Sequence, residues 1–217
     1  EKVEILPIRT DCTILAPTGE QVVKKESIKD LGFTLAADGR MQHELSRGIG
    51  SATADFKTLQ RVWSHSTLGV RRKLRVCEAC ITSKVTYGLH VAWLNQAERK
   101  RLDGFYCRCL RRILHIPHAH SSRLSNDEVF RRAGVRPLSK VMLAKQLNYL
   151  HKLANLPSDS ELRASIFTPG SLQLSKPVGG RRVGRPRAVW GESVWKTALD
   201  VARSESSLAS FMNGKFS

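Results

Sequence analysis

The chain has 217 residues, of which 41% are hydrophobic, and its 36 lysines and arginines against 19 aspartates and glutamates give a formal net charge of +17. This length suits one well-packed domain, with or without a smaller appendage, and the apolar content argues against global disorder. The excess of positive charge favours a polyanionic partner such as DNA, RNA or an anionic membrane surface.

That charge is unevenly distributed. Residues 1–39 hold five Lys/Arg and seven Asp/Glu, a net charge of −2, whereas residues 40–217 hold 31 and 12, a net charge of +19. The first segment therefore differs in kind from the rest of the chain.

Several features indicate an intracellular protein. The five cysteines are odd in number and irregularly spaced, which fits reduced thiols better than a secreted disulfide scaffold. No run of about 18 apolar residues occurs and no charged-then-apolar leader opens the chain, so we expect no membrane span and no membrane partner. The chain begins at Glu1 and not at a methionine, from which we expect a fragment of a longer protein.

The predicted secondary structure changes from strands to helices near residue 38. Before it, the runs rich in β-forming residues are 3–6, 12–15, 21–23 and 28–35. After it, apolar residues recur every three or four positions, which predicts helices. These helices cover residues 41–63, 67–93, 95–116, a short stretch after Ser125, a stretch from Pro137 that ends before Pro157, and residues 190–202.

Local signals mark the ends of several helices. Asn95 with Glu98, and Ser125 with Glu128, have the spacing of a capping box. Gly88 weakens the end of the second helix, Pro117 ends the third, and Gly134 ends the short fourth helix.

The elements together predict a mainly α fold. We expect four parts: a β-containing segment at residues 1–36, a helical bundle at 37–157, a basic Gly/Pro linker at 158–188, and a terminal helix and tail at 189–217.

The linker ends in an arginine-rich arm, residues 179–187, that leads into Trp190. Glycine and proline keep this stretch extended, so its guanidinium groups suit phosphate oxygens or a narrow minor groove. We expect sequence-nonspecific backbone binding, and the alternatives are groove reading of the AT-hook kind and a merely solvated linker. The arginines of this arm are Arg181, Arg182, Arg185 and Arg187.

Two predicted helices also carry dense basic residues with few opposing acids, which favours a continuous positive groove over an ordinary solvated face. The candidates on the second helix are Arg71, Arg72, Lys73 and Arg75, and those on the third are Arg108, Arg111 and Arg112.

Cysteine, histidine and aromatic residues offer further candidate sites. The pairs Cys77/Cys80 and Cys107/Cys109, with nearby histidines, could suggest zinc, but they lie inside predicted helices, so we interpret them as buried small hydrophobes. Trp63, Trp93 and Tyr149 are expected in the core and not as base-stacking platforms, and the role of Trp190 is open. No catalytic residue is assigned, because no nucleophile motif surrounds any serine or cysteine.

Several strings, read in order over residues 20–195, resemble the downstream part of reverse transcriptases from non-LTR (LINE-type) retrotransposons. They are Leu31-Gly32, Asp38-Gly39-Arg40-Met41, Glu44-Leu45, Ile49-Gly50, Tyr87-Gly88, Trp93-Leu94, Arg101-Leu102-Asp103, Cys109-Leu110-Arg111-Arg112-Ile113-Leu114, Ser125-Asn126, Glu128-Val129 and Gly184-Arg185-Pro186-Arg187 with Trp190.

This resemblance implies a thumb-like bundle and C-terminal extension that follow the palm domain. The palm and its metal-binding aspartates would lie upstream, so Mg²⁺ is expected only there and this chain alone is expected to be inactive as an enzyme. The implied partners are the RNA template, the DNA primer or target, and the upstream palm and fingers, and the implied location is nuclear. Two alternatives remain: a stand-alone basic helical DNA- or RNA-binding protein, and a non-functional remnant of a decayed element, to which departures such as Asp30 and Gly48 point.

Overall fold

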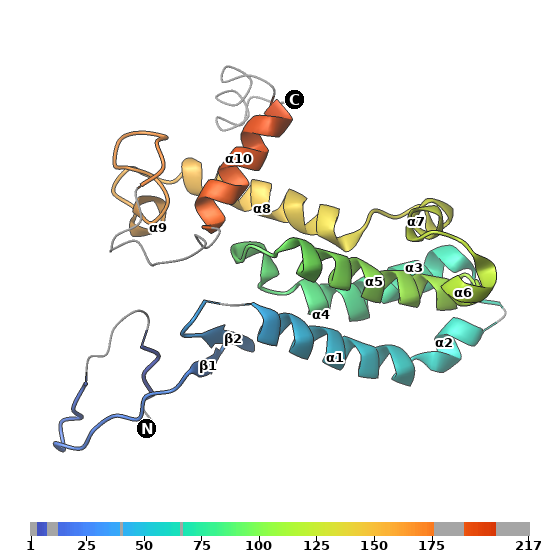
Figure 1. The fold of residues 1–217 in the computed structure, drawn as a ribbon, viewed down its shortest axis with the longest axis horizontal. Helices are drawn as coiled ribbons and strands as arrows, with labels where there is room; N and C mark the ends of the chain where they lie inside the picture. The colour runs from blue at the N-terminus through green and yellow to red at the C-terminus, as the bar shows by residue number, and fades with distance from the viewer. Residues whose placement is uncertain (1–3, 8–12, 40, 66, 176–188, 203–217) are drawn as a thin grey trace. The chain divides into compact units, whose positions relative to one another are not determined.

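A computed structural model of the chain describes residues 4–7, 13–39, 41–65, 67–175 and 189–202 (Figure 1). Over these residues the protein is mainly helical, with a small two-stranded antiparallel sheet near its N-terminus. The predicted fold class is therefore confirmed.

The described residues divide into two compact units. Unit 1 takes residues up to 89 together with 94–138, and unit 2 takes residues 90–93 together with those from 139 onward. We had expected the helix after Pro137 to belong to one bundle with the earlier helices. Its apolar residues instead share a core with segments that follow it in the sequence, so it belongs with unit 2.

The N-terminal sheet is a hairpin in which β1 (Ser27–Asp30) pairs with β2 (Phe33–Ala36). Between the strands, Leu31 and Gly32 have φ values of 46° and 83°, the left-handed backbone that a tight two-residue loop requires. The continuous strand predicted over 28–35 is therefore two strands and a turn, because the β-rich composition conceals the turn at Gly32.

Upstream of the hairpin, extended residues pair only at single positions. Ile5 bridges Lys24 in parallel orientation, and Leu15 bridges Gln21 in antiparallel orientation. The predicted strands at residues 3–6, 12–15 and 21–23 are thus reduced to bridges, and residues 3 and 12 lie outside the described part of the chain.

A buried carboxylate fastens the hairpin to the first helix. Glu44 is 5% exposed, and its carboxylate accepts hydrogen bonds from the Thr34 backbone N–H at 3.0 Å and from Arg47 Nε at 2.9 Å. Arg47 Nη2 also donates to the Gly32 carbonyl at 2.8 Å. Burial alone raises the pKa of Glu44, but the hydrogen bonds from Arg47 and Thr34 outweigh it and leave the pKa lowered.

The helices of unit 1 follow the predicted spans with two interruptions. The span 41–63 breaks at Leu59, and the span 67–93 contains a π-helical turn, η1, and then ends at Gly88. The elements are α1 (Gln42–Thr58), α2 (Gln60–Ser64), α3 (Val70–Cys77), η1 (Glu78–Thr82), α4 (Ser83–Thr86), α5 (Gln96–Ile113), α6 (Ala119–Ser122) and α7 (Asn126–Ala133).

Gly88 ends the second span for a steric reason. Its φ is +69°, and a Cβ at this position would lie 2.4 Å from Cδ2 of Phe33 on the hairpin. Only glycine fits this close approach without a shift of the Phe33 ring. The chain continues as a short 3₁₀ helix, η2 (Leu89–Val91).

The helix-end signals read from the sequence are largely confirmed. Asn95 and Glu98 form a complete capping box at the start of α5, and the Ser125 side chain accepts a hydrogen bond from the Glu128 N–H at the start of α7. Gly134 ends α7 in the left-handed conformation. Helix α5 stops at Ile113, before Pro117, and contacts α1, α2, α3 and α7, so it is the central helix of unit 1.

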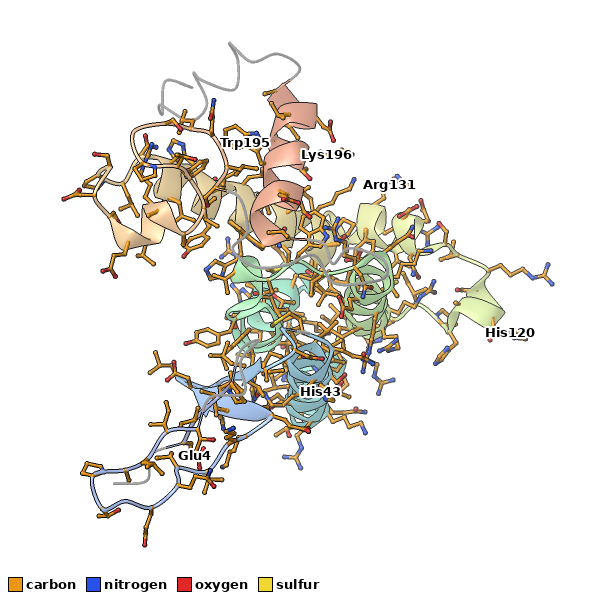
Figure 2. All side chains as sticks on the ribbon, turned by 60° about the vertical axis from the view of Figure 1, so that its left-hand side comes forward. Glu4, His43, His120, Arg131, Trp195 and Lys196 are labelled. Atoms are coloured by element: carbon orange, nitrogen blue, oxygen red, sulfur yellow. The ribbon has the colours of Figure 1, made fainter. Side chains whose placement is uncertain are left out.

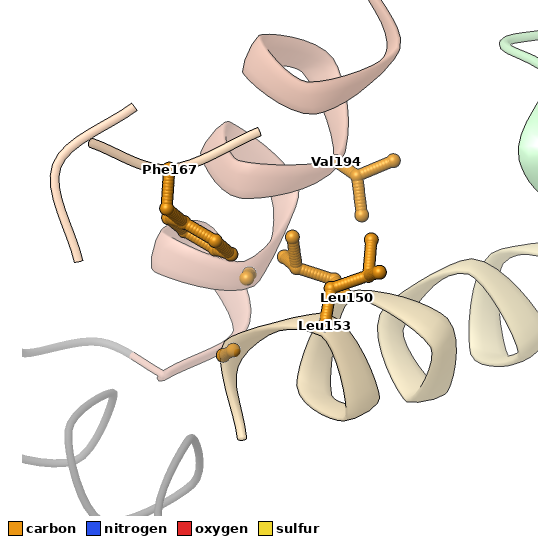
Figure 3. Close-up of a cluster of buried hydrophobic side chains, with 6 residues drawn as sticks. Leu150, Leu153, Phe167 and Val194 are labelled. Atoms are coloured by element: carbon orange, nitrogen blue, oxygen red, sulfur yellow. The ribbon is translucent and has the colours of Figure 1, made fainter. Parts of the chain in front are cut away.

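Unit 2 builds its core from segments far apart in the sequence. Figure 3 shows Leu150 and Leu153 beside Phe167 and Val194. The elements are α8 (Leu138–Ala154), α9 (Glu161–Ala164) and α10 (Trp190–Ala202).

The predicted linker does not begin at residue 158. Residues 161–164 form α9, and Phe167, which is fully buried, bridges Leu174. The side chain of Arg163 donates to the carbonyls of Ala154, Leu156 and Ser171 and so holds this stretch against the end of α8. The stretch looked like a linker because its apolar residues, such as Ile166 and Phe167, show no helical or strand spacing and pack against helices far away in the sequence.

Candidate nucleic-acid interface

The structure separates the predicted basic residues into three groups. Five are exposed, two are buried, and the four arginines of the arm, Arg181, Arg182, Arg185 and Arg187, lie outside the described residues. The exposed ones are Arg71, Arg72 and Arg75 on α3, and Arg108 and Arg112 on α5. The two helices pack against each other in unit 1.

Lys73 belongs to the buried group. It is 4% exposed, and its Nζ donates to the Trp63 carbonyl at 2.7 Å, which links the end of α2 to α3. A run of basic residues does not show which of them are exposed. A helix turns by about 100° per residue and so places adjacent side chains on different faces. We therefore remove Lys73 from the candidate interface.

Arg111 is buried as well, at 7% exposure. It donates to the Pro117 carbonyl at 3.1 Å, the Ser122 hydroxyl at 2.9 Å and the Leu124 carbonyl at 2.5 Å. Its guanidinium is occupied by the loop that follows α5 and cannot at the same time contact a phosphate, so Arg111 is also removed from the direct contacts.

One exposed face of α5 carries arginine at three positions. Arg101, Arg108 and Arg112 are separated by seven and four residues, a spacing that aligns them along one side of the helix, and we call them the α5 stripe. Arg101 also donates to the Ser46 hydroxyl on α1 at 2.8 Å. Arg101 was not among the residues predicted for the site. Its distance of seven residues from Arg108 is the signal that could have identified it.

Most acidic residues in the helical part of unit 1 already have a partner, and Asp103 on α5 is one of them. Glu44 is bonded to Arg47, Asp55 pairs with Lys84 at 2.6 Å, and Glu98 caps α5. Glu128 pairs with Arg131 and Arg132, whose hydrogen bonds lower the pKa of Glu128 to about 2.

Among the residues that the structure describes, two arginines of the stripe have no such neutralising partner. Within the described part of the chain, Arg108 and Arg112 form no ion pair, and no aspartate or glutamate occurs between residues 104 and 126. Residues 41–138 hold 18 Lys/Arg against seven Asp/Glu, a net charge of +11. The face can therefore attract and contact an anionic polymer.

Most of the described cysteines are buried, and Cys12 lies outside the described residues. Cys77, Cys107 and Cys109 are buried, as predicted, whereas Cys80 is exposed. Burial raises the pKa of Cys77 and Cys109 to about 12, so both thiols stay protonated at neutral pH. Among the described residues, no group of three or more His, Cys, Asp or Glu side chains could hold a metal ion.

The predicted core aromatics lie in the cores. Trp63 is 1% exposed in unit 1 and stacks on Phe56 with ring centroids 4.7 Å apart. In unit 2, Trp93 and Tyr149 are half-buried against the core, and Trp190 donates its indole N–H to the His90 carbonyl at 2.9 Å. Trp190 is thus a packing residue and does not form a free stacking platform.

In the described part of the chain, no helix combines the length and apolar character that crossing a membrane requires.

Comparison of the chain with protein-family models, with curated proteins and with solved structures found no match. The resemblance to non-LTR reverse transcriptases accordingly rests on the sequence strings alone.

Proposed function

We propose that the chain binds the nucleic-acid backbone, without reading its sequence, through the exposed basic residues of α3 and α5. The observation that carries the proposal is the α5 stripe, in which three exposed arginines lie along one helix face and no acid occurs from residue 104 to residue 126. Phosphate contacts by arginine provide affinity and orientation, and they do not depend on base identity.

The setting for this binding is the thumb and C-terminal portion of a non-LTR reverse transcriptase. Two things support it: the ordered sequence strings, and a helical unit whose central helix presents cations. In the whole enzyme this surface would follow the backbones of the RNA template and the DNA primer. The aspartates that hold the metal ions would belong to an upstream palm, so the chain by itself makes no product in a primer-extension assay with Mg²⁺.

A salt titration tests the binding. Affinity for a short fluorescein-labelled DNA duplex is measured by anisotropy at several salt concentrations for the wild type and for Arg108→Ala with Arg112→Ala. Each phosphate contact on B-DNA contributes about −0.9 to the slope of log K against log[salt]. We expect the double variant to flatten that slope by about 1.8.

The matched control removes the same charge elsewhere. Arg131→Ala with Arg132→Ala deletes two arginines on α7 that are already paired with Glu128. We expect a much smaller change of slope, and equal changes in both double variants would reduce the proposal to nonspecific attraction by net charge.

The reverse-transcriptase setting has a separate test in the genomic reading frame upstream of Glu1. A palm segment with paired aspartates in that frame supports the setting. A start codon immediately upstream refutes it and favours a stand-alone basic helical DNA- or RNA-binding protein.

A further inference from the structure

The loop after α5 contains no fully buried residue. It covers residues 114–124 and includes α6, none of whose residues is buried. Its exposed side chains include His115, His118, His120 and Arg123. Figure 2 shows His120 at the outer edge of unit 1. Hydrophobic burial of α6 therefore does not account for the path of the loop.

A buried arginine supplies the order instead. Arg111 bonds to three acceptors spread along the loop, at Pro117, Ser122 and Leu124. These acceptors are two carbonyls and a hydroxyl, and none of them is a carboxylate. Burial of a guanidinium with only neutral partners opposes folding unless its donors are well satisfied. Arg111 is therefore a buried charged side chain whose hydrogen bonds go to an exposed loop.

The loop backbone is also strained at both ends. His115 has φ of 55° and Arg123 has φ of 51°, and neither is glycine. Residues other than glycine adopt this left-handed backbone conformation at a cost in energy. They keep it where the surrounding structure holds the backbone in place. Arg111 bonds to Pro117 and Ser122, which lie between these two positions, and to Leu124, which directly follows Arg123.

The loop continues the basic face of α5. It begins two residues after Arg112, and no aspartate or glutamate lies within it. Arg123 is exposed and follows directly on Ser122, one of the acceptors of Arg111. Fixing that acceptor fixes the backbone from which the Arg123 side chain extends.

We propose that residues 114–124, the Arg111-anchored loop, form a second contact for the nucleic-acid backbone, and that Arg111 acts as the residue that positions it. This inference rests on the proposed function. Arg123 provides the direct phosphate contact, and Arg111 touches no phosphate. An arginine whose backbone is held in place loses less conformational freedom when it binds than one on a mobile loop.

A double-mutant cycle tests the proposal on the full chain, with the same labelled DNA duplex. Arg123→Asn removes the charge and keeps a residue that tolerates the left-handed backbone. Arg111→Gln keeps a donor and loses the three-way anchor. We expect Arg123→Asn to flatten the salt slope by about 0.9 in the wild type and by clearly less in the Arg111→Gln background. Arg108→Ala flattens it equally in both backgrounds.

A milder variant covers the case in which Arg111→Gln fails to fold, as judged by circular dichroism. Ser122→Ala removes one acceptor of Arg111 without changing any charge, and it is expected to shrink the effect of Arg123→Asn in part. The inference is overturned if Arg123→Asn leaves the slope unchanged while Arg108→Ala flattens it, or if its effect is the same in all three backgrounds. Absence of any duplex binding by the wild type overturns the proposed function itself.

Discussion

Units 1 and 2 differ in where their basic residues lie and in how their cores are assembled. Unit 1 has a net charge of +10, with its Lys/Arg spread over the helices, whereas unit 2 has a net charge of +7, of which residues 139–175 and 189–202 carry only +1. The core of unit 1 centres on one long helix, and that of unit 2 joins α8, α10 and the stretch around Phe167. Among the described residues, we therefore assign binding to unit 1 and interpret unit 2 as a packing unit held by aromatic side chains.

The largest expected effect comes from removing the central aromatic of unit 2. Phe167 is fully buried, and its ring meets that of Trp195 edge-on with centroids 5.7 Å apart. Replacing it with alanine should lower the free energy of unfolding of unit 2 by about 3–5 kcal/mol. Hydrogen exchange followed residue by residue measures this, with faster exchange expected in α8 and α10 and unchanged protection in α5. Equal loss of protection in α5 would show that the two units unfold together.

The same contrast explains what the sequence could predict. In unit 1 the signals are local: the three-or-four spacing of apolar residues gave the helices, and Asn95 with Glu98 gave the start of α5. In unit 2 the decisive contacts are not local, so the stretch around Phe167 looked like a linker. For the candidate site, the density of basic residues on the third predicted helix pointed to Arg108 and Arg112, which are exposed. It could not distinguish Arg111, whose partners lie on a loop with no recognisable pattern.

A second prediction concerns the contact between the hairpin and the α4–η2 turn. Gly88→Ala places a methyl group against the Phe33 ring and also forces alanine into a left-handed backbone. We expect a loss of about 2–4 kcal/mol in a urea titration, from overpacking together with backbone strain. The control is Gly134→Ala, which has φ of +65° with nothing within 4 Å of the added Cβ, and it should cost only about 1 kcal/mol. Equal losses would remove the steric part of the argument.

A third prediction is the pH dependence of the hairpin anchor. The pKa of Glu44 is lowered in the folded state. The carboxylate therefore contributes to the free energy of unfolding at pH values above its unfolded pKa of about 4.3, and this contribution is lost as the pH falls through the folded pKa. Glu44→Gln should therefore destabilise the protein on the order of 1–3 kcal/mol at pH 7 and by less near pH 3. Urea titrations at the two pH values check the sign. A larger gap between wild type and variant at low pH contradicts it.

The smallest expected effect separates stability from binding within unit 1. Asn95 accepts a hydrogen bond from the Glu98 N–H at 2.9 Å and caps the helix that bears the α5 stripe. Asn95→Ala should cost about 1 kcal/mol in a urea titration. Because Arg108 and Arg112 lie more than three turns along the helix from this cap, the salt slope for the DNA duplex should stay at the wild-type value. Ser125→Ala, which removes the cap of α7, is the matched control and should behave alike. A flattened slope in Asn95→Ala alone would mean that fraying at the start of α5 reaches the arginines, and that stability and binding in unit 1 are coupled through the whole helix.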